Sequence, residues 1–166
     1  MSIPWTIDDI LSATAGELVS CTDAEQFSGV GIDSRKIGAD EVFVAISGQR
    51  HDGHSFLSGV IGQGVRCVIV CRDKLDTLPV SKWRAGAVAC VSVKDTTAAL
   101  GALAAYQRER AGVPVIAITG SNGKTTTKEM AARVLGRQFR VLATSGNLNN
   151  EIGLPLTLLE LGPEHQ

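Results

Sequence analysis

The sequence has no run approaching the ~18 apolar residues that a helix needs to cross a bilayer. Its N-terminus also lacks the positive segment and apolar stretch of a secretory signal peptide. We therefore expect a cytoplasmic protein that does not insert into a membrane. Excess basic charge is missing too: 16 basic and 17 acidic residues give a net charge of −1. This balance argues against a nucleic-acid partner bound through a wide basic face.

Disulfides are also not expected, nor is a metal bound by the cysteines or histidines. Cys67 and Cys71, two of four cysteines, lie in the apolar run 65–71, which predicts a strand. Four strand residues span about 13 Å, too far for a disulfide or a shared zinc ion, so both cysteines are expected to be small core residues. His51 and His54 have no third or fourth ligand nearby in the sequence, so we expect no metal there.

The hydrophobic content of 44% and charged content of 20% are those of an ordinary globular protein. Apolar periodicity and turn residues predict strands at 27–32, 42–46, 65–71, 87–93, 115–118 and 139–143. They predict helices near 6–15, 56–63, 95–110, 124–136 and 154–161. The segment 72–84, which contains Pro79, is expected to be a connector with little regular structure.

This order predicts an α/β fold with two domains that meet at Ala111–Gly112, which Pro114 follows closely. The first, residues 1–111, is a small mixed α/β domain that includes the connecting helix 95–110. The second, residues 112–166, has the order strand, helix, strand, helix, which implies parallel strands. Two strands and two helices cannot bury both faces of such a sheet, so we expect a truncated domain and a chain that is a fragment.

The run Val113–Thr127 reads as a buried strand, a tight glycine turn and the start of a helix. Gly120 and Gly123 allow dihedrals that other residues resist, and they let backbone N–H groups approach a ligand closely. The helix beginning near Lys124 directs its free N–H groups at the same point. Lys124 can reach β- and γ-phosphate oxygens, and the hydroxyl of Thr125 can coordinate Mg²⁺. The pattern predicts a cradle for a nucleoside triphosphate.

The general phosphate-loop pattern G-x-x-x-x-G-K-[ST] is incomplete, because Ile118 stands where the first glycine is expected. The alternative is a plain strand-to-helix turn with a solvated lysine. A bare glycine turn does not explain why lysine and threonine occur together in the first helical turn, and we therefore favour the cradle.

Three stretches together resemble the Mur ligases, the ATP-dependent amide-forming enzymes of peptidoglycan precursor synthesis. The run Thr119-Gly-Ser-Asn-Gly-Lys-Thr-Thr126 resembles their phosphate loop, which also lacks the generic first glycine. Asp33-Ser-Arg35, with Phe43-Val-Ala45, Gly48 and Asp52-Gly-His54, is similar to the N-terminal domain of the two members that add the third residue and the terminal dipeptide. Gly146-Asn-Leu-Asn-Asn-Glu-Ile-Gly153, followed by Pro155-Leu-Thr157, resembles the member that adds the dipeptide.

The resemblance implies a UDP-sugar-binding N-terminal domain, a central ATPase domain and a further C-terminal domain. It implies UDP-N-acetylmuramoyl-tripeptide and D-alanyl-D-alanine as substrates, with ATP and Mg²⁺, and we expect a monomer. ATP would phosphorylate the peptide carboxylate, and the amine would attack the acyl phosphate. Such chemistry needs phosphate charge neutralised and water excluded more than it needs a protein nucleophile.

Lys124 is the one residue of this chain for which the resemblance implies a catalytic role. The implied ATP-binding residues are Thr119, Gly120, Ser121, Asn122, Gly123, Lys124, Thr125, Thr126 and Asn150. The implied metal ligands are Thr125 and Glu151. Helix capping is an alternative role for Thr126 and for Asn150.

Ser34 and Arg35 follow a predicted strand, where a hydroxyl and a guanidinium can bind a pyrophosphate or a uracil. Without the resemblance, a turn residue and a surface arginine would be the simpler interpretation. The implied UDP-substrate residues are Ile32, Ser34, Arg35, Gln49, Arg50 and His51. His54 is expected to pack or cap beneath that loop, and Lys128 and Glu129 to be exposed helix charges.

Other functions stay open at this point. One is the preceding tripeptide-forming Mur ligase or a folyl-polyglutamate synthetase, against which the run Asn147–Gly153 argues. Another is a non-catalytic nucleotide-binding module that uses its phosphate loop as a sensor.

Overall fold

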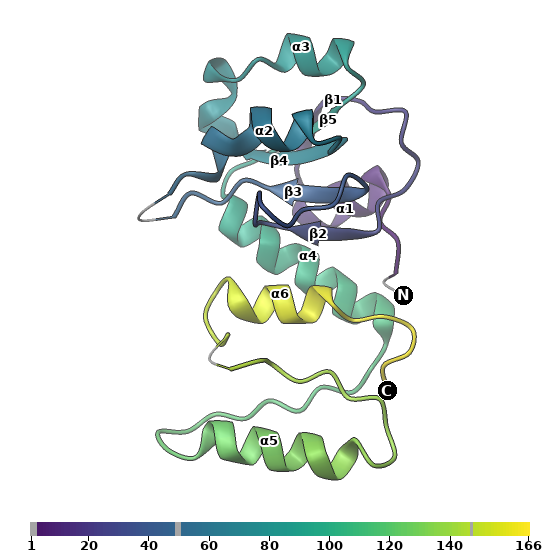
Figure 1. Ribbon diagram of the computed structural model, residues 1–166, viewed down its shortest axis with the longest axis vertical. Coiled ribbons are helices and arrows are strands. Elements are labelled where there is room, and N and C mark those ends of the chain that lie inside the picture. The colour runs from purple at the N-terminus through teal and green to yellow at the C-terminus, as the bar shows by residue number, and fades with distance from the viewer. Residues whose placement is uncertain (1–2, 49–50, 147) are drawn as a thin grey trace.

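The computed structural model describes residues 3–48, 51–146 and 148–166, and its centre is a five-stranded sheet (Figure 1). The strands are β1 (Glu17–Ser20), β2 (Gly29–Gly31), β3 (Glu41–Val44), β4 (Cys67–Cys71) and β5 (Ala89–Val93). Their order across the sheet is β1-β5-β4-β3-β2. The neighbouring pairs among β2 to β5 are parallel, and β1 alone runs antiparallel, beside β5. The predicted α/β class is confirmed.

Helices cover both faces of the sheet. The described residues form the helices α1 (Ile7–Thr14), η1 (Gly53–Phe56), α2 (Leu57–Gly62), η2 (Arg72–Thr77), α3 (Val80–Ala85), α4 (Thr96–Ala111), α5 (Lys124–Leu135) and α6 (Gly153–Leu159), of which α5 lies away from the sheet (Figure 1). One core lies between the sheet and α1, α4 and α6, and the other lies between the sheet and α2 and α3. Because both faces are covered, the central strands are apolar throughout, as their sequences predicted.

The long helix α4 joins the sheet to the C-terminal part of the chain. Asp95 caps its start by accepting hydrogen bonds from two backbone N–H groups, and Gly112, at φ 63°, ends it in the left-handed conformation. Leu100 and Leu103 are fully buried against the sheet. Farther along, buried Gln107 donates from Nε2 to the carbonyl of Leu161, 2.6 Å away. Helix α6 therefore packs on α4 and takes part in the same core.

Two predictions about the first 111 residues are wrong. The sequence 17–20 was not expected to form a strand, yet it pairs with β5 at the sheet edge. The segment 72–84 was expected to be irregular, but it contains η2 and α3. Trp83 explains α3, because burial of its large side chain in the second core offsets the weak helix preference of so short a segment.

The strands predicted at 115–118 and 139–143 are not formed in the structure. Neither segment is hydrogen-bonded into a ladder with any strand of the described residues. Val115 and Ile116, expected to be covered on both faces, are 55% and 65% exposed. A strand exists only where a neighbour supplies hydrogen-bond partners, and an apolar run carries no information about that neighbour.

The cysteines are free, and Cys67 and Cys90 are buried core residues. Cys71 is only partly buried, at the end of β4. In the part of the chain that the structure describes, no helix is long and apolar enough to cross a membrane.

We expect Leu103→Ala to lower the free energy of unfolding by about 2–5 kcal/mol, because it leaves a cavity between α4 and the sheet. Chemical denaturation followed by circular dichroism measures the change. The control Lys82→Ala, at an exposed position of α3, should change stability by less than about 0.5 kcal/mol. Equal losses in the two variants would show that this face of α4 is not a core face.

Candidate functional site

The glycine turn, residues 119–123, leads directly into α5. Gly120 has φ 142° and Gly123 has φ 76°, values that residues with a side chain rarely adopt. A Cβ on Gly123 would meet no atom within 4 Å, so the turn borders open space. Gly123 is also the N-cap of α5, and no side chain caps the helix there. The first backbone N–H groups of α5 are thus available to an anion, with the positive end of the helix dipole behind them.

Lys124 lies over this turn. Its Nζ donates to the carbonyl of Gly120, four residues earlier, which folds the side chain back across the turn. Thr125 and Thr126 are exposed in the first turn of α5, and neither side chain caps the helix. The capping alternative for Thr126 is therefore not observed.

The asparagine loop, residues 144–151, is attached at both of its ends. At its start, Lys128 of α5 donates from Nζ to the carbonyls of Thr144, at 2.5 Å, and Gly146, at 3.4 Å. At its end, Asn150 accepts hydrogen bonds at Oδ1 from the N–H groups of Ile152 and Gly153, the latter at 2.7 Å. Asn150 thus has the capping role left open by the sequence, and Lys128 is not the free charge that was expected.

Glu151 and Asn150 line a groove between α4 and the segment 149–158, with a volume of about 770 Å³. The groove also includes Asp95 and Arg108 at its α4 side. Glu151 is exposed and so accessible to a ligand. The residues that the structure describes contain no cluster of three or more histidine, cysteine or acidic side chains able to hold a metal.

The turn after β2 holds Arg35 in an ion pair. Arg35 donates from Nε and Nη2 to the two carboxylate oxygens of Asp33, at 2.9 and 2.8 Å. The Arg35 guanidinium holds the pKa of the Asp33 carboxyl well below its usual value, and the carboxylate raises the pKa of Arg35. Arg35 is nevertheless 82% exposed. An exposed pair of this kind contributes little to stability, so the guanidinium can exchange one anion for another at little cost.

Two other residues predicted to bind the UDP-substrate lie beside this turn. Ser34 is half-buried within it, and Ile32 packs against the first core. Packing of Ile32 leaves its backbone, rather than its side chain, as the part best placed to meet a ligand.

The histidine loop, residues 47–52, follows β3. Gln49 and Arg50, both predicted to bind the UDP-substrate, lie outside the described residues. Ser47 and Asp52 pair across the base of the loop, and Gly48 donates to the carbonyl of His51 at 2.9 Å. The side chain of His51 is exposed.

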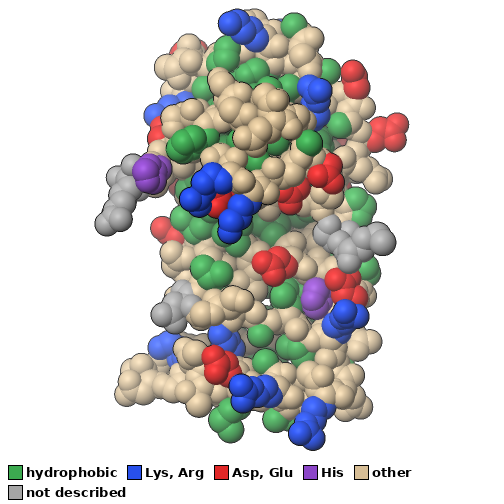
Figure 2. All heavy atoms as spheres, in the orientation of Figure 1, with side chains coloured by type: hydrophobic (Ala, Val, Ile, Leu, Met, Phe, Trp, Pro, Cys, Tyr) green, Lys and Arg blue, Asp and Glu red, His purple; other side chains and the backbone are tan. Residues whose placement is uncertain are grey.

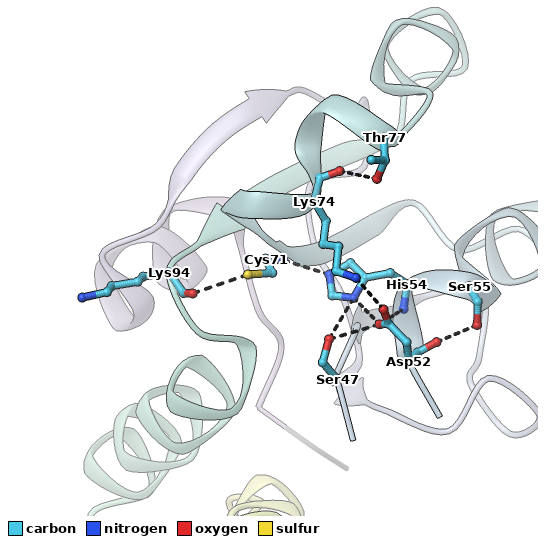
Figure 3. Close-up of polar contacts among 8 residues, drawn as sticks. All are labelled: Ser47, Asp52, His54, Ser55, Cys71, Lys74, Thr77 and Lys94. Atoms are coloured by element: carbon cyan, nitrogen blue, oxygen red, sulfur yellow. Dashed lines mark hydrogen bonds and ion pairs between the residues drawn. The ribbon is translucent and has the colours of Figure 1, made fainter. Parts of the chain in front are cut away.

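His54 lies beneath the histidine loop, as predicted, and is 8% exposed (Figure 3). Its Nε2 accepts a hydrogen bond from the N–H of Cys71 at 2.9 Å, and its Nδ1 lies 2.7 Å from Asp52 Oδ1. Lys74 donates to the other carboxylate oxygen of Asp52 at 2.9 Å. Because both ring nitrogens of His54 have protein partners, the metal interpretation of His51 and His54 is not supported.

All these loops lie on one side of the molecule. The parallel strands end at a single edge of the sheet, where the turn 33–36 follows β2, the histidine loop follows β3 and Lys74 follows β4. Figure 1 shows the glycine turn and the asparagine loop on the same side of the view as this edge. Figure 2 shows acidic and basic side chains interspersed over the viewed face, without a wide basic surface.

Sequence reasoning did not identify three residues that the structure brings to these loops: Asp52 and Lys74 as a pair, and Lys128. Lys128 had a usable signal, since it stands four residues after Lys124 and so lies on the same face of α5. Asp52 and Lys74, which are 22 positions apart, carry no such signal, because only the sheet brings the two side chains together.

A parallel α/β sheet with loops at its carboxyl edge, and a glycine turn at an uncapped helix, define a protein of the nucleotide-binding α/β class. Two family profiles match the chain. The one described as "Mur ligase family, catalytic domain" matches residues 26–108, and the one described as "Mur ligase middle domain" matches residues 118–166. The chain belongs to the Mur ligase family.

Two similar proteins carry the same name. A UDP-N-acetylmuramoyl-tripeptide–D-alanyl-D-alanine ligase from Bacillus subtilis is 44% identical over 165 residues, which cover 98% of this chain and 34% of that protein. The ligase of the same name from Escherichia coli is 37% identical over 162 residues, or 94% of this chain and 34% of that protein.

Solved structures agree with this result. A crystal structure of MurF from Acinetobacter baumannii matches with a TM-score of 0.84 and 38% identity, over 99% of this chain and 34% of that one. The MurF ligase from Thermotoga maritima in complex with ADP matches with a TM-score of 0.69 and 32% identity, over 82% of this chain and 30% of that one. The chain therefore spans about a third of the length of its relatives.

We expect Lys128→Met to loosen the asparagine loop, because it removes the ammonium that binds the carbonyls of Thr144 and Gly146. Hydrogen–deuterium exchange measured by mass spectrometry should be about tenfold faster in residues 148–154, and unchanged in the sheet. The matched control is Arg133→Met, which removes an exposed charge from the same helix. Equal exchange in both variants would contradict the role of Lys128.

Proposed function

We propose that this chain is the first third of an ATP-dependent amide ligase that adds D-alanyl-D-alanine to UDP-N-acetylmuramoyl-tripeptide. ATP transfers its γ-phosphoryl group to the terminal carboxylate of the tripeptide, which gives an acyl phosphate and ADP. The amine of D-alanyl-D-alanine then attacks the acyl carbon, and phosphate leaves as the amide forms. The reaction belongs to peptidoglycan precursor synthesis.

The observation that carries this proposal is the glycine turn at the uncapped start of α5, with Lys124 above it. Backbone N–H groups and one lysine can neutralise triphosphate oxygens without a protein nucleophile, as acyl-phosphate formation requires. The relatives named above support the particular reaction, because both carry the name of the ligase that adds the dipeptide.

On the ATP side, the backbone and side chains of residues 119–126 would bind the phosphates. Lys124 would bind oxygens of the β- and γ-phosphates once its ammonium leaves the carbonyl of Gly120. Asn150 would add a contact while it continues to cap α6 through Oδ1, since its Nδ2 donors are not used in that cap.

The residues present fit a magnesium ion, because oxygen donors are available. The hydroxyl of Thr125 and the carboxylate of Glu151 are both exposed and would hold Mg²⁺, which would neutralise phosphate charge. Phosphate oxygens and water would supply the remaining ligands.

On the UDP side, Ser34, Arg35 and His51 would bind the nucleotide at the carboxyl edge of the sheet, with Gln49 and Arg50 of the histidine loop and the backbone at Ile32. Arg35 would exchange the Asp33 carboxylate for a phosphate, which its exposure allows. We further propose that residues 1–111 form the UDP-substrate domain and residues 112–166 begin the ATPase domain of a monomeric, cytoplasmic enzyme.

We expect Lys124→Ala to abolish ligation in the full-length enzyme, because no other side chain of the glycine turn carries a positive charge. The assay measures release of ADP and phosphate with and without UDP-muramoyl-tripeptide and D-alanyl-D-alanine. Binding of the UDP-substrate, measured by calorimetry, should be nearly unchanged. Normal turnover in the variant would refute the role of Lys124. If the wild type releases no ADP in response to both substrates, the protein is instead a nucleotide sensor.

We expect Arg35→Ala to raise the KM for the UDP-substrate about tenfold or more, because a charge-assisted hydrogen bond to phosphate is lost. The KM for ATP should stay within about twofold of the wild-type value. Lys36→Ala, the exposed neighbouring charge, is the control. An effect confined to ATP would contradict the assignment of this turn to the UDP-substrate.

A further inference from the structure

Two separate stretches of the chain, each contributing two segments, meet at His54. The segments are the base of the histidine loop, the start of η1, the end of β4 and the 3₁₀ helix η2 (Figure 3). The imidazole is almost fully buried between them, with 5% of its side chain exposed. Its two nitrogens have different partners and therefore different chemical tasks.

Toward β4, Nε2 of His54 accepts the hydrogen bond of the Cys71 N–H, the last residue of the strand. An imidazole nitrogen that accepts carries no proton, so the ring proton is on Nδ1. Toward the histidine loop, Nδ1 donates this proton to Asp52 Oδ1 at 2.7 Å. The ring is thus a polar bridge from the strand to the loop.

The Asp52 carboxylate accepts the other hydrogen bonds at this point. Its Oδ1 also accepts from the Ser47 hydroxyl, at 3.1 Å, across the base of the histidine loop. Its Oδ2 accepts from Lys74 at 2.9 Å. Burial alone would raise the pKa of the Asp52 carboxyl, but the hydrogen bonds from Lys74, His54 and Ser47 together hold it well below its usual value. Asp52 is therefore a carboxylate at neutral pH and accepts from all three groups at once.

The backbone at this point has almost no room to move. Gly53 donates to the carbonyl of Ile46 at 2.8 Å, and a Cβ on Gly53 would lie only 2.8–2.9 Å from backbone atoms of Ala45 and Ile46. Because the backbone is packed this closely, a shift of His54 would also displace both ends of the histidine loop.

We propose that Asp52, His54 and Lys74 form a positioning network that fixes the base of the histidine loop, Ser47 and Asp52, against the end of β4 and thereby sets the affinity for the UDP-linked substrate. This inference rests on the proposed function, because it takes the loop to be part of the UDP-substrate site. The three residues are positioning residues: they act through the loop, and the network leaves ATP binding at the glycine turn unaffected.

Two substitutions of His54 separate its two hydrogen bonds. In His54→Gln, the amide lies near the place of Nε2 and can still accept from the Cys71 N–H. In His54→Asn, the shorter amide can replace only Nδ1, so the Cys71 N–H loses its acceptor. His54→Gln in turn loses the donor to Asp52. We expect each substitution to weaken binding of the UDP-substrate about tenfold, because each breaks one of the two hydrogen bonds through which the ring joins the strand to the loop.

The measurement is calorimetric titration of the full-length protein with UDP-muramoyl-tripeptide, together with KM for each substrate and kcat. A purely structural role would lower the melting temperature without changing the affinity of the folded protein. Positioning instead predicts a higher KM for the UDP-substrate, with KM for ATP and kcat within about twofold of wild type.

Lys74→Met tests the network from its exposed side, where loss of folding is not expected. It should weaken binding of the UDP-substrate severalfold, whereas the control Lys82→Met, at an exposed site of α3, should have no effect. Binding of the UDP-substrate is also measured for Asp52→Asn. Its matched control is Asp76→Asn, which changes an exposed carboxylate of η2.

The outcomes separate this inference from the proposed function. If the wild type binds the UDP-substrate and Arg35→Ala weakens binding, but His54→Asn and Lys74→Met bind normally, the positioning network is refuted and the proposed function stands. If the wild type binds neither the UDP-substrate nor UDP, both fail. Weaker binding in Arg35→Ala, His54→Asn, His54→Gln and Lys74→Met supports both.

Discussion

The structure depends on the burial of three parallel strands, β3, β4 and β5, on both faces. Their backbone groups pair with one another, and their side chains alternate between the two cores. Parallel strands must all run the same way, so every connection leaves from the same edge. That constraint brings the turn after β2, the histidine loop and Lys74 together, although they are separated by tens of residues.

Helix α4 connects the sheet to the C-terminal part of the chain. It packs on the sheet through Leu100 and Leu103, and its buried Gln107 amide donates to the carbonyl of Leu161, just after α6. The asparagine loop ends at α6, where Asn150 caps the helix, and begins at Lys128 of α5. A continuous series of contacts therefore runs from the sheet to the helix that follows the glycine turn. In the proposed ligase, this series would connect the UDP side to the ATP side.

Local chemistry made much of this predictable. The helices predicted near 6–15 and 95–110 are found as α1 and α4, capped at Thr6 and Asp95, because capping involves only neighbouring residues. The glycine turn before α5 was predictable for the same reason. The strand β1 was not, because its four residues become a strand only by pairing with β5, more than 70 residues away.

The sequence by itself determined the fold class, the strands β3, β4 and β5, most of the helix ends and the glycine turn, since each depends on residues within one element. Only the tertiary structure decided that Val115 and Ile116 are exposed, that Lys128 supports the asparagine loop, and that His54 joins Asp52 to Cys71. These features depend on which segments become neighbours. Neighbours are selected by the packing of the whole chain, and no single stretch of sequence contains that information.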